Sequence, residues 1–335
     1  MIFTRQGEGP LLNRRDIPDM PPDIIDPSSV FNPGAVEKNG KTFLLLRVQT
    51  RGRRTFLVPA TGDGITFKIA RHPVEFFGLD RWCESEGDPS LTVHHVYDPR
   101  ITVLEDSLYV VTAIDTDRGC RLAAWRAAGR PQTGYAGLEK LELVGFTAGR
   151  DTRNGVLFPE KVDGRYLMLD RPNDRRTGGG PHTGRGIILS GSADLEKWEE
   201  IGPVMQGRKH FWDELIGSGP PPVKTREGWL HVYHGVAAHF LGVNIYQAGA
   251  VLLDLEDPRQ VLARTEENIL EPREIWEVTG QVANVVFPSG LTVTATDNEG
   301  FAKPDAELRL YYGAADTAVG LATAKVADVV AACRS

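Results

Sequence analysis

The strongest constraint on the fold is a short apolar segment that recurs five times along the chain. Each copy is rich in Leu, Val and Tyr and is only about five or six residues long, which is typical of a strand rather than of a helix. The copies follow one another at intervals of roughly sixty to seventy residues, which leaves little room for helices between them. The segments are residues 43–47, 108–113, 166–171, 230–234 and 308–312.

Turn-forming residues precede four of these segments, as they do in β-hairpins. A regular repeat of hairpins predicts one sheet per repeat, with the sheets closed around an axis. We therefore predict an all-β fold, a five-bladed β-propeller in which each repeat forms one four-stranded blade. A pair of β-sandwiches with scattered surface charges is the alternative. The turns are residues 38–41, 105–107, 163–165 and 226–228.

The two ends of the chain depart from the repeat. Residues 1–30 contain many Pro and Asp residues and are expected to form an extended arm over the domain. Residues 320–335 carry apolar side chains at helical spacing, which predicts a short C-terminal helix. Residues 1–335 are thus expected to form a single propeller domain.

Polar residues stand at the ends of the predicted strands. Because equivalent strand ends converge on the axis of a propeller, these side chains should face one another across one pocket. In a sandwich their alignment would be coincidental. The residues are Arg47, Asp115, Arg171 and His234, with Asp316 shortly after the fifth strand.

Asp98 is the strongest candidate for a catalytic group. Pro99 disfavours a helical conformation at Asp98 and keeps it extended or in a turn. Arg100 would favour the ionised carboxylate, whereas Tyr97 and the apolar flanks would desolvate it and raise its pKa toward general-acid use. Taken alone, an Asp-Pro pair is equally typical of an ordinary turn.

A second group of residues is suited to binding anions and sugars. Arg153 and Arg171 carry the planar guanidinium that binds phosphate or carboxylate through two hydrogen bonds. Asn154 can both donate to and accept from sugar hydroxyls. His234 could donate to an anion or a hydroxyl. Surface salt bridges for the arginines, and a satisfied core histidine, are the alternatives.

Composition limits the remaining functional classes. With 335 residues, 41% hydrophobic and 25% charged, the chain can bury a sizeable core. A net charge of -7 argues against a nucleic-acid or anionic-membrane partner, so an anionic ligand would need a focused cluster of cations. No apolar run approaches the roughly 18 residues that span a membrane, and no secretory leader is evident, so we expect a cytoplasmic protein. No metal-binding or nucleotide-binding motif is present, and we expect neither a metal nor a cofactor.

Several ordered motifs resemble glycoside hydrolase family 130, the β-mannoside phosphorylases and related β-mannosidases. The resemblance runs from about residue 30 to residue 320. The motifs are Asn-Pro-Gly-Ala at 32–35, Tyr-Asp-Pro-Arg at 97–100, Asn-Gly-Val-Leu-Phe-Pro-Glu-Lys at 154–161, Ile-Gly-Ser-Gly-Pro-Pro at 216–221, Gly-Trp-Leu-His-Val-Tyr-His-Gly at 228–235 and Tyr-Tyr-Gly-Ala-Ala-Asp at 311–316.

This resemblance implies a five-bladed propeller and an inverting reaction. Inorganic phosphate, the co-substrate, attacks the mannosyl anomeric carbon of a β-mannosyl-glucose or β-manno-oligosaccharide and gives α-mannose 1-phosphate. Asp98 matches the general acid, whose proton passes through the mannosyl 3-hydroxyl. One carboxyl group suffices because phosphate needs no base, whereas an inverting hydrolase needs a second one. By the same resemblance, Arg153, Arg171 and His234 would bind phosphate, and Asn32, Arg47, Tyr97, Asn154 and Asp316 would bind the sugar.

One position departs from the pattern of the family. Many of its phosphorylases have a Lys directly before the Ile-Gly-x-Gly-Pro-Pro run, and here that position is Leu215. A charge-assisted hydrogen bond contributes about 1.5–3 kcal/mol, so its loss would weaken phosphate binding. The cations that could compensate from nearby loops are Arg208, Lys209 and Lys224.

Two other functions remain open at this stage. If no cation compensates, water could replace phosphate and the protein would be an inverting β-mannosidase, with Glu214 or Asp213 recruited as the base. A carbohydrate-binding propeller without catalysis is the third hypothesis, although it would have no reason to bury Asp98 beside two arginines. The sequence leaves open whether the chain forms a homo-oligomer.

Overall fold

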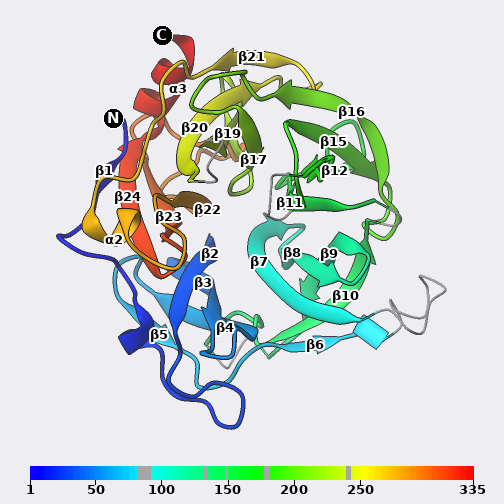
Figure 1. Ribbon diagram of the computed structural model, residues 1–335. Coiled ribbons are helices and arrows are strands. Elements are labelled where there is room, and N and C mark those ends of the chain that lie inside the picture. The colour runs from blue at the N-terminus through cyan, green and yellow to red at the C-terminus, as the bar shows by residue number, and fades with distance from the viewer. Residues whose placement is uncertain (81–91, 131–133, 148–149, 177–181, 239–242) are drawn as a thin grey trace.

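The protein is a β-propeller whose blades surround a central axis, as seen along that axis in Figure 1. The computed structural model describes residues 1–80, 92–130, 134–147, 150–176, 182–238 and 243–335. Strands dominate these residues, and the prediction of an all-β five-bladed propeller is confirmed.

Each blade begins with an inner strand and continues outward through antiparallel neighbours. Blade 1 consists of β2 (Ser29–Lys38), β3 (Lys41–Gln49), β4 (Thr55–Gly62) and β5 (Phe67–Ile69). Blade 2 consists of β7 (Val93–Leu104), β8 (Ser107–Thr116), β9 (Gly119–Ala127) and β10 (Lys140–Phe146), with β6 (Glu75–Phe77) parallel to β10. Blade 3 consists of β11 (Thr152–Leu157), β12 (Tyr166–Pro172), β15 (Gly186–Ser192) and β16 (Glu199–Gln206), while β13 (Arg175–Arg176) pairs with β14 (His182–Thr183).

The last two blades complete the ring. Blade 4 consists of β17 (Leu215–Ser218), β19 (Gly228–Ala237), β20 (Ile245–Leu253) and β21 (Val261–Arg264), with β18 (Val223–Thr225) also paired to β19. Blade 5 consists of β22 (Val286–Val293), β23 (Glu307–Ala314), β24 (Ala318–Lys325) and β1 (Thr4–Arg5).

The five apolar segments that predicted the repeat are the second strands of the blades, β3, β8, β12, β19 and β23. They are apolar because a second strand packs against neighbouring blades on both of its faces. Leu45 of β3, for example, shares one core cluster with Ile101 of β7 and Val110 of β8. Burying one such side chain contributes about 1.5–3 kcal/mol, so the contacts between blades hold the ring together.

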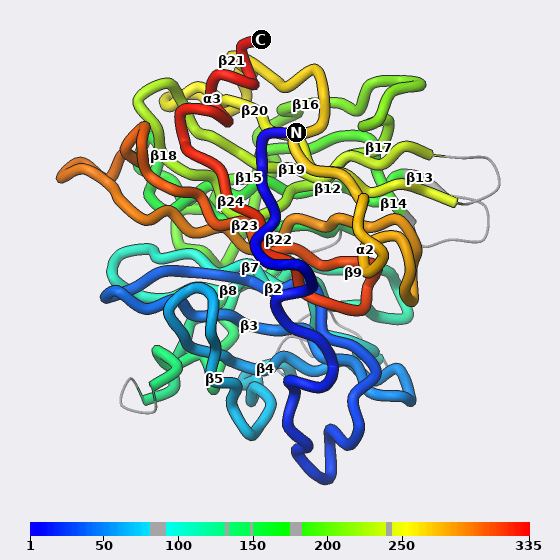
Figure 2. Tube along the Cα trace, turned by 90° about the vertical axis from the view of Figure 1, so that its left-hand side faces the viewer, coloured from blue at the N-terminus to red at the C-terminus, as the bar shows by residue number. Residues whose placement is uncertain are grey.

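The N-terminal arm does more than lie over the domain, because its first residues supply the outermost strand of blade 5. Thr4 and Arg5 pair with Thr323 and Ala322 of β24, and Figure 2 shows this segment running alongside β24. Arg5 also donates to both carboxylate oxygens of Glu277, at 2.7 and 2.6 Å. The two ends of the chain thus meet in one sheet, which closes the ring, and the rest of the arm includes a short 3-10 helix at Arg14–Asp16.

The C-terminal helix is present but begins later than predicted. Residues 318–325 form β24, and only Val326–Arg334 form α3. The predicted start at residue 320 was wrong because the ladder with β23 satisfies the backbone of these residues, which outweighs their helical spacing. α3 buries Val326, Val329, Val330 and Cys333, and α2 (Ile275–Val278) is the other α-helix of the described chain.

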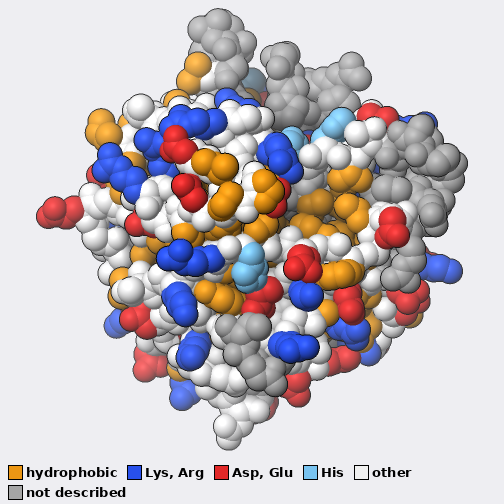
Figure 3. Space-filling view, turned by 90° about the horizontal axis from the view of Figure 1, so that it is seen from below, with side chains coloured by type: hydrophobic (Ala, Val, Ile, Leu, Met, Phe, Trp, Pro, Cys, Tyr) orange, Lys and Arg blue, Asp and Glu red, His pale blue; other side chains and the backbone are white. Residues whose placement is uncertain are grey.

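The outer surface carries charges of both signs. Figure 3 shows basic and acidic side chains interspersed over one side of the propeller. None of the helices in the described part of the chain is both long and apolar enough to span a bilayer.

Candidate active site

Three inner strands contain a β-bulge at the same place, and each bulge holds a polar residue with a left-handed backbone. These residues are Asn32 of β2, Asp98 of β7 and Asn154 of β11, with φ values of 44°, 52° and 56°. Asn and Asp tolerate this conformation better than most residues, and a bulge redirects a side chain out of the regular alternation. The bulges bring side chains from different blades together: Asn32 Nδ2 donates to Asp98 Oδ1 at 3.0 Å.

The Asp98 carboxylate is held as an anion. Arg47 Nη1 donates to Asp98 Oδ1 at 2.8 Å, and the Asp98 side chain is 13% exposed. Burial alone would raise the pKa of Asp98, but the charges of Arg47 and Arg100 outweigh it and lower the pKa below its usual value. Of the two opposing effects expected from the sequence, the neighbouring charges therefore win over desolvation in the free protein.

Tyr97 contacts two cations of the site. The Tyr97 ring centroid is 4.5 Å from Arg47 Cζ and 5.9 Å from Arg153 Cζ, so it is near both guanidinium groups. The Tyr97 hydroxyl donates to Asp115 Oδ1 at 3.0 Å, and Arg153 Nη2 donates to the same oxygen at 2.9 Å. Asp115 thus orients both side chains.

Arg171 is buried beside Arg153 without a carboxylate of its own. It is 7% exposed, its Nη2 donates to Asn173 Oδ1 at 2.7 Å, and its Nε lacks a partner. Burial and then the charge of Arg153 lower the pKa of Arg171 to about 10. Asn173 is oriented in turn by Asp151, since Asn173 Nδ2 donates to Asp151 Oδ1 at 2.6 Å. The site therefore keeps a buried cation whose charge no described carboxylate pairs.

His234 closes the site on the side of blade 4. It is 1% exposed and lies against the Phe287 ring, with 4.7 Å between the ring centroids. Burial, followed by the charges of Arg171 and Arg100, lowers the pKa of His234 well below its usual value, so the imidazole is neutral. Gly217 leaves room for it, because a Cβ there would lie 2.5 Å from His234 Cε1 and 2.7 Å from Asn154 Oδ1.

Asp316 is a second carboxyl group near Asp98 and, like Asp98, it is only partly exposed. It follows β23 with a left-handed φ of 50°. Burial raises the pKa of Asp316 to about 6; Arg47 opposes this shift, and Asp98 adds to it. At neutral pH the site thus contains two neighbouring carboxylates and Arg47.

The predicted site residues lie together in the structure. Each of them contacts another predicted residue or interacts with it electrostatically. Sequence reasoning missed Asn173, Phe287 and Tyr246, whose ring centroid lies 6.1 Å from that of His234, and it gave Asp115 no partner. Asn173 lies two residues after Arg171, and this spacing, which puts both side chains on one face of an extended segment, was the available signal. The predicted residues are Asp98, Arg153, Arg171, His234, Asn32, Arg47, Tyr97, Asn154 and Asp316.

Leu215 is buried at the start of β17 and pairs with Val236. Two of the cations proposed to replace the missing lysine are already paired elsewhere. Arg208 binds Asp213 and Glu266, and Lys224 binds Glu160. Lys209 is exposed.

The carboxylates suggested as a hydrolytic base are also engaged. Asp213 is fully buried and accepts hydrogen bonds from Arg208, Arg264 and the Tyr233 hydroxyl. Glu214 lies 3.6 Å from Arg185. Asp213 is enclosed and these three donors already occupy its oxygens, so it is poorly placed to contact and activate water.

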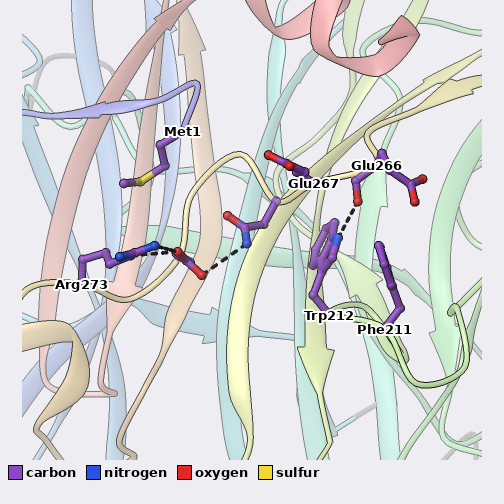
Figure 4. Close-up of a pocket in the computed structure, with 8 residues that line it drawn as sticks. Met1, Phe211, Trp212, Glu266, Glu267 and Arg273 are labelled. Atoms are coloured by element: carbon purple, nitrogen blue, oxygen red, sulfur yellow. Dashed lines mark hydrogen bonds and ion pairs between the residues drawn. The ribbon is translucent and has the colours of Figure 1, made fainter.

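A separate cavity of about 270 Å³ lies beside the loop that precedes β17 (Figure 4). The Trp212 indole that borders it donates to the Glu266 carbonyl at 2.8 Å. No residue predicted for the site lines this cavity, so it is distinct from the central site. Its lining residues are Met1, Phe211, Trp212, Glu266, Glu267, Asn268, Glu271 and Arg273.

No group of three or more His, Cys, Asp or Glu side chains is placed to hold a metal ion within the residues that the structure describes.

Comparisons with known proteins agree with this geometry. The family model described as "beta-1,4-mannooligosaccharide phosphorylase" matches residues 13–335. A β-1,4-mannooligosaccharide phosphorylase of Ruminococcus albus is 32% identical over 339 residues, covering 98% of this chain and 90% of the relative. A 1,2-β-oligomannan phosphorylase of a Thermoanaerobacter species is 30% identical over 309 residues, covering 90% and 92%.

Among solved structures, β-1,2-mannobiose phosphorylase from Listeria innocua superposes with a TM-score of 0.78 at 24% identity, covering 100% of this chain and 99% of that one. This likeness bears on the fold, while the family match rests on sequence over nearly the whole chain. The chain belongs to glycoside hydrolase family 130.

Proposed function

We propose that the protein is an inverting β-mannoside phosphorylase. The observation that carries this proposal is Arg171, a buried cation next to Arg153 that has no carboxylate partner among the described residues. A buried charge is costly unless it is compensated, and phosphate would compensate it through two charge-assisted hydrogen bonds. Both relatives named above are phosphorylases, which supports the same conclusion.

In the proposed reaction, one phosphate oxygen bonds to the mannosyl anomeric carbon as the bond from that carbon to the leaving oxygen breaks. The proton of Asp98 passes through the mannosyl 3-hydroxyl to the leaving oxygen, and Asp98 becomes a carboxylate. Configuration inverts, which gives α-mannose 1-phosphate and the shortened saccharide. Because the free protein holds Asp98 as an anion, the carboxylate must take up a proton before each turnover.

We assign phosphate to Arg153, Arg171 and the neutral His234, which can donate a hydrogen bond. The mannosyl unit contacts the five other polar residues of the site, which offer both donors and acceptors to its hydroxyls. We also propose that the enzyme works in the cytoplasm, since a cell retains a charged sugar phosphate made inside it. The sugar-binding residues are Asn32, Arg47, Tyr97, Asn154 and Asp316.

The substrate class is a β-mannoside with at least two sugar units, such as β-mannosyl-glucose or a β-manno-oligosaccharide. The relatives act on linkages named as β-1,4 and β-1,2, so both linkages belong in the assay.

A hydrolase on the same fold is the second candidate, and Leu215 is the observation that favours it, since no cation stands at that position. An inverting hydrolase also needs a second carboxylate to activate water. The ion pairs of Asp213 and Glu214 oppose this role. Phosphorolysis is therefore the better supported reaction.

The test incubates the purified protein with β-1,4- and β-1,2-mannobiose, with and without phosphate, and measures mannose 1-phosphate and free mannose. Mannose 1-phosphate formed only with phosphate supports the proposal, and free mannose under both conditions supports the hydrolase. Binding without turnover indicates a carbohydrate-binding propeller.

A variant tests the role of Asp98 directly. Asp98→Asn should lower turnover by about 10²–10⁴-fold, the range for general-acid catalysis, while the thermal unfolding curve keeps its shape. Asp305→Asn, at an exposed carboxylate, is the matched control and should turn over normally. A near-normal rate in Asp98→Asn would refute the assignment.

A further inference from the structure

Arg100 lies directly beneath the proposed general acid and contacts its backbone. Its side chain is fully enclosed, with 1% of the residue exposed. Arg100 Nη1 donates to the carbonyl oxygens of Asp98 and Pro99, at 3.2 and 3.3 Å. Both carbonyls belong to the bulge that turns Asp98 out of its strand. The guanidinium therefore binds the backbone of the acid, while Arg47 binds its carboxylate.

The same guanidinium reaches across the axis to two other blades. Its Nε donates to the carbonyl oxygen of Gly219 at 2.7 Å, in the segment that follows β17. Its Cζ lies 5.5 Å from the centroid of the Phe287 ring on β22. The Pro99 carbonyl is confined from the other side as well, because a Cβ on Gly34 of β2 would come within 2.7 Å of it. Arg100 thus fixes the bulge of blade 2 relative to blades 4 and 5.

The equivalent bulges show that this arginine is not needed to form a bulge. In β2, β7 and β11 the ladder resumes after two unpaired residues, at Gly34, Arg100 and Val156. Asn32 and Asn154 keep the same left-handed backbone with a glycine or a valine at this position. The arginine occurs where the bulged residue is a carboxylic acid, so its placement relates to the acid rather than to the backbone shape alone.

We infer that Arg100 is a positioning residue for the reaction, which fixes the backbone of Asp98 and places a positive charge beneath its carboxyl group. This inference rests on the proposed function, because it takes Asp98 as the general acid. A displacement of about 1 Å in a catalytic group can cost about 10²-fold in rate, so a backbone clamp at this point has a measurable consequence.

The charges around Asp98 give the direction of a second effect. Asp98 faces Arg47 on β3 and Asp316 after β23, and Arg100 itself faces His231 and His234 on β19. Burial and Arg100 help to hold both imidazoles neutral, since the pKa of each lies below its usual value. Removing the charge of Arg100 should therefore raise the pKa of Asp98. Because a general acid is active when protonated, the fall of kcat/KM with rising pH should move to higher pH.

The test compares two variants. Arg100→Met removes the charge and all hydrogen-bond donors, whereas Arg100→Lys keeps the charge but loses the planar guanidinium with its several donors. Thr102→Ala is the matched control, since Thr102 is a buried polar residue on the same strand whose hydroxyl reaches the Leu157 carbonyl at 3.5 Å. For each variant we would measure thermal unfolding, the pH profile of kcat/KM with mannobiose and phosphate, and the titration of Asp98 in the free protein. The titration uses the carboxyl ¹³C signal, assigned by its absence in Asp98→Asn.

For Arg100→Met we expect kcat/KM to fall about 100-fold, the KM for phosphate to change less than about 3-fold, and Asp98 to titrate at higher pH. For Arg100→Lys we expect a titration near that of the parent protein with kcat still reduced. Thr102→Ala should lower the unfolding temperature alone. A folded Arg100→Met with the parent titration and rate would overturn the inference; if this variant does not fold, parent-like kcat in Arg100→Lys would do so.

These experiments distinguish a failure of the inference about Arg100 from a failure of the proposed function. If Asp98→Asn keeps its activity, the proposed function fails, yet the titration of Asp98 in the Arg100 variants still reports the charge effect. If Asp98→Asn is inactive and both Arg100 variants behave as the parent, only this inference fails.

Discussion

The two sides of the central site hold their arginines in different ways. Arg47 forms a 2.8 Å ion pair with Asp98, so cation and anion compensate each other in the free protein. Arg171 instead contacts the neutral amide of Asn173 and lies beside another arginine. A buried charge without a partner destabilises the fold, whereas a paired one largely cancels. The difference fits the proposed function, in which phosphate supplies the negative charge that compensates Arg171, whereas Asp98 already compensates Arg47 in the free protein.

Between the two sides of the site, the largest effect is expected from removing Arg171, which no described carboxylate pairs. Arg171→Met should raise the KM for phosphate about 100-fold, since a charge-assisted hydrogen bond contributes about 1.5–3 kcal/mol, and change the KM for the mannoside far less. Initial rates over a phosphate series check this, with Arg259→Met, an exposed arginine paired only locally with Asp257, as the control. An unchanged phosphate KM would show that Arg171 does not serve the anion.

A smaller effect is expected for Asp316 on the opposite side. Its pKa of about 6 in the folded protein exceeds the ordinary value of 3.8, so the stability linked to its protonation is present below about pH 4 and is lost as pH rises through 6. Asp316→Asn stays neutral and should be more stable than the parent above pH 6, by on the order of 2 kcal/mol, with weaker sugar turnover. Denaturant unfolding at pH 4 and pH 7.5 measures this. Equal differences between the two proteins at both pH values would contradict it.

The smallest effect concerns the residue that orients Arg171. Asn173→Ala removes one hydrogen bond, worth about 1 kcal/mol, and should raise the phosphate KM roughly 5-fold with kcat nearly unchanged. Asn173→Asp sharpens the comparison, because it gives Arg171 the carboxylate that Arg47 already has. Phosphate kinetics should show a larger rise in KM for Asn173→Asp than for Asn173→Ala. The reverse order would mean that compensation of the Arg171 charge is unimportant.

The propeller architecture could be predicted from the sequence because one pattern of apolar strand and turn is repeated. Each second strand contains an apolar segment, and turn-forming residues precede four of the five. This pattern is local, so it can be recognised without knowing how the blades pack. The strand and helix boundaries near the two chain ends could not be predicted in the same way. Residues 320–325 were predicted to belong to the C-terminal helix but lie in β24, and Thr4–Arg5 form a strand because the other end of the chain lies beside them.

Some of the site residues could also be identified from the sequence. Asp98 stands out because Pro99 follows it between apolar flanks, and Arg171 stands out because it ends an apolar strand. Asn173 and Asp151 do not stand out, because their role is to orient Arg171 through hydrogen bonds that form only in the folded chain. The environment of Leu215 was equally hidden: Arg208 and Lys224 are near it in sequence, yet their own carboxylates hold them.

The amino-acid order was enough to specify the ring of sheets and the types of side chain that would meet at its centre, because strand period and turn chemistry are local properties. The ionisation of Asp98 and the lack of a described carboxylate partner for Arg171 were settled by the fold, since both depend on charges contributed by separate blades. Electrostatic interactions act through space, and the distances that set them exist only once the ring has closed.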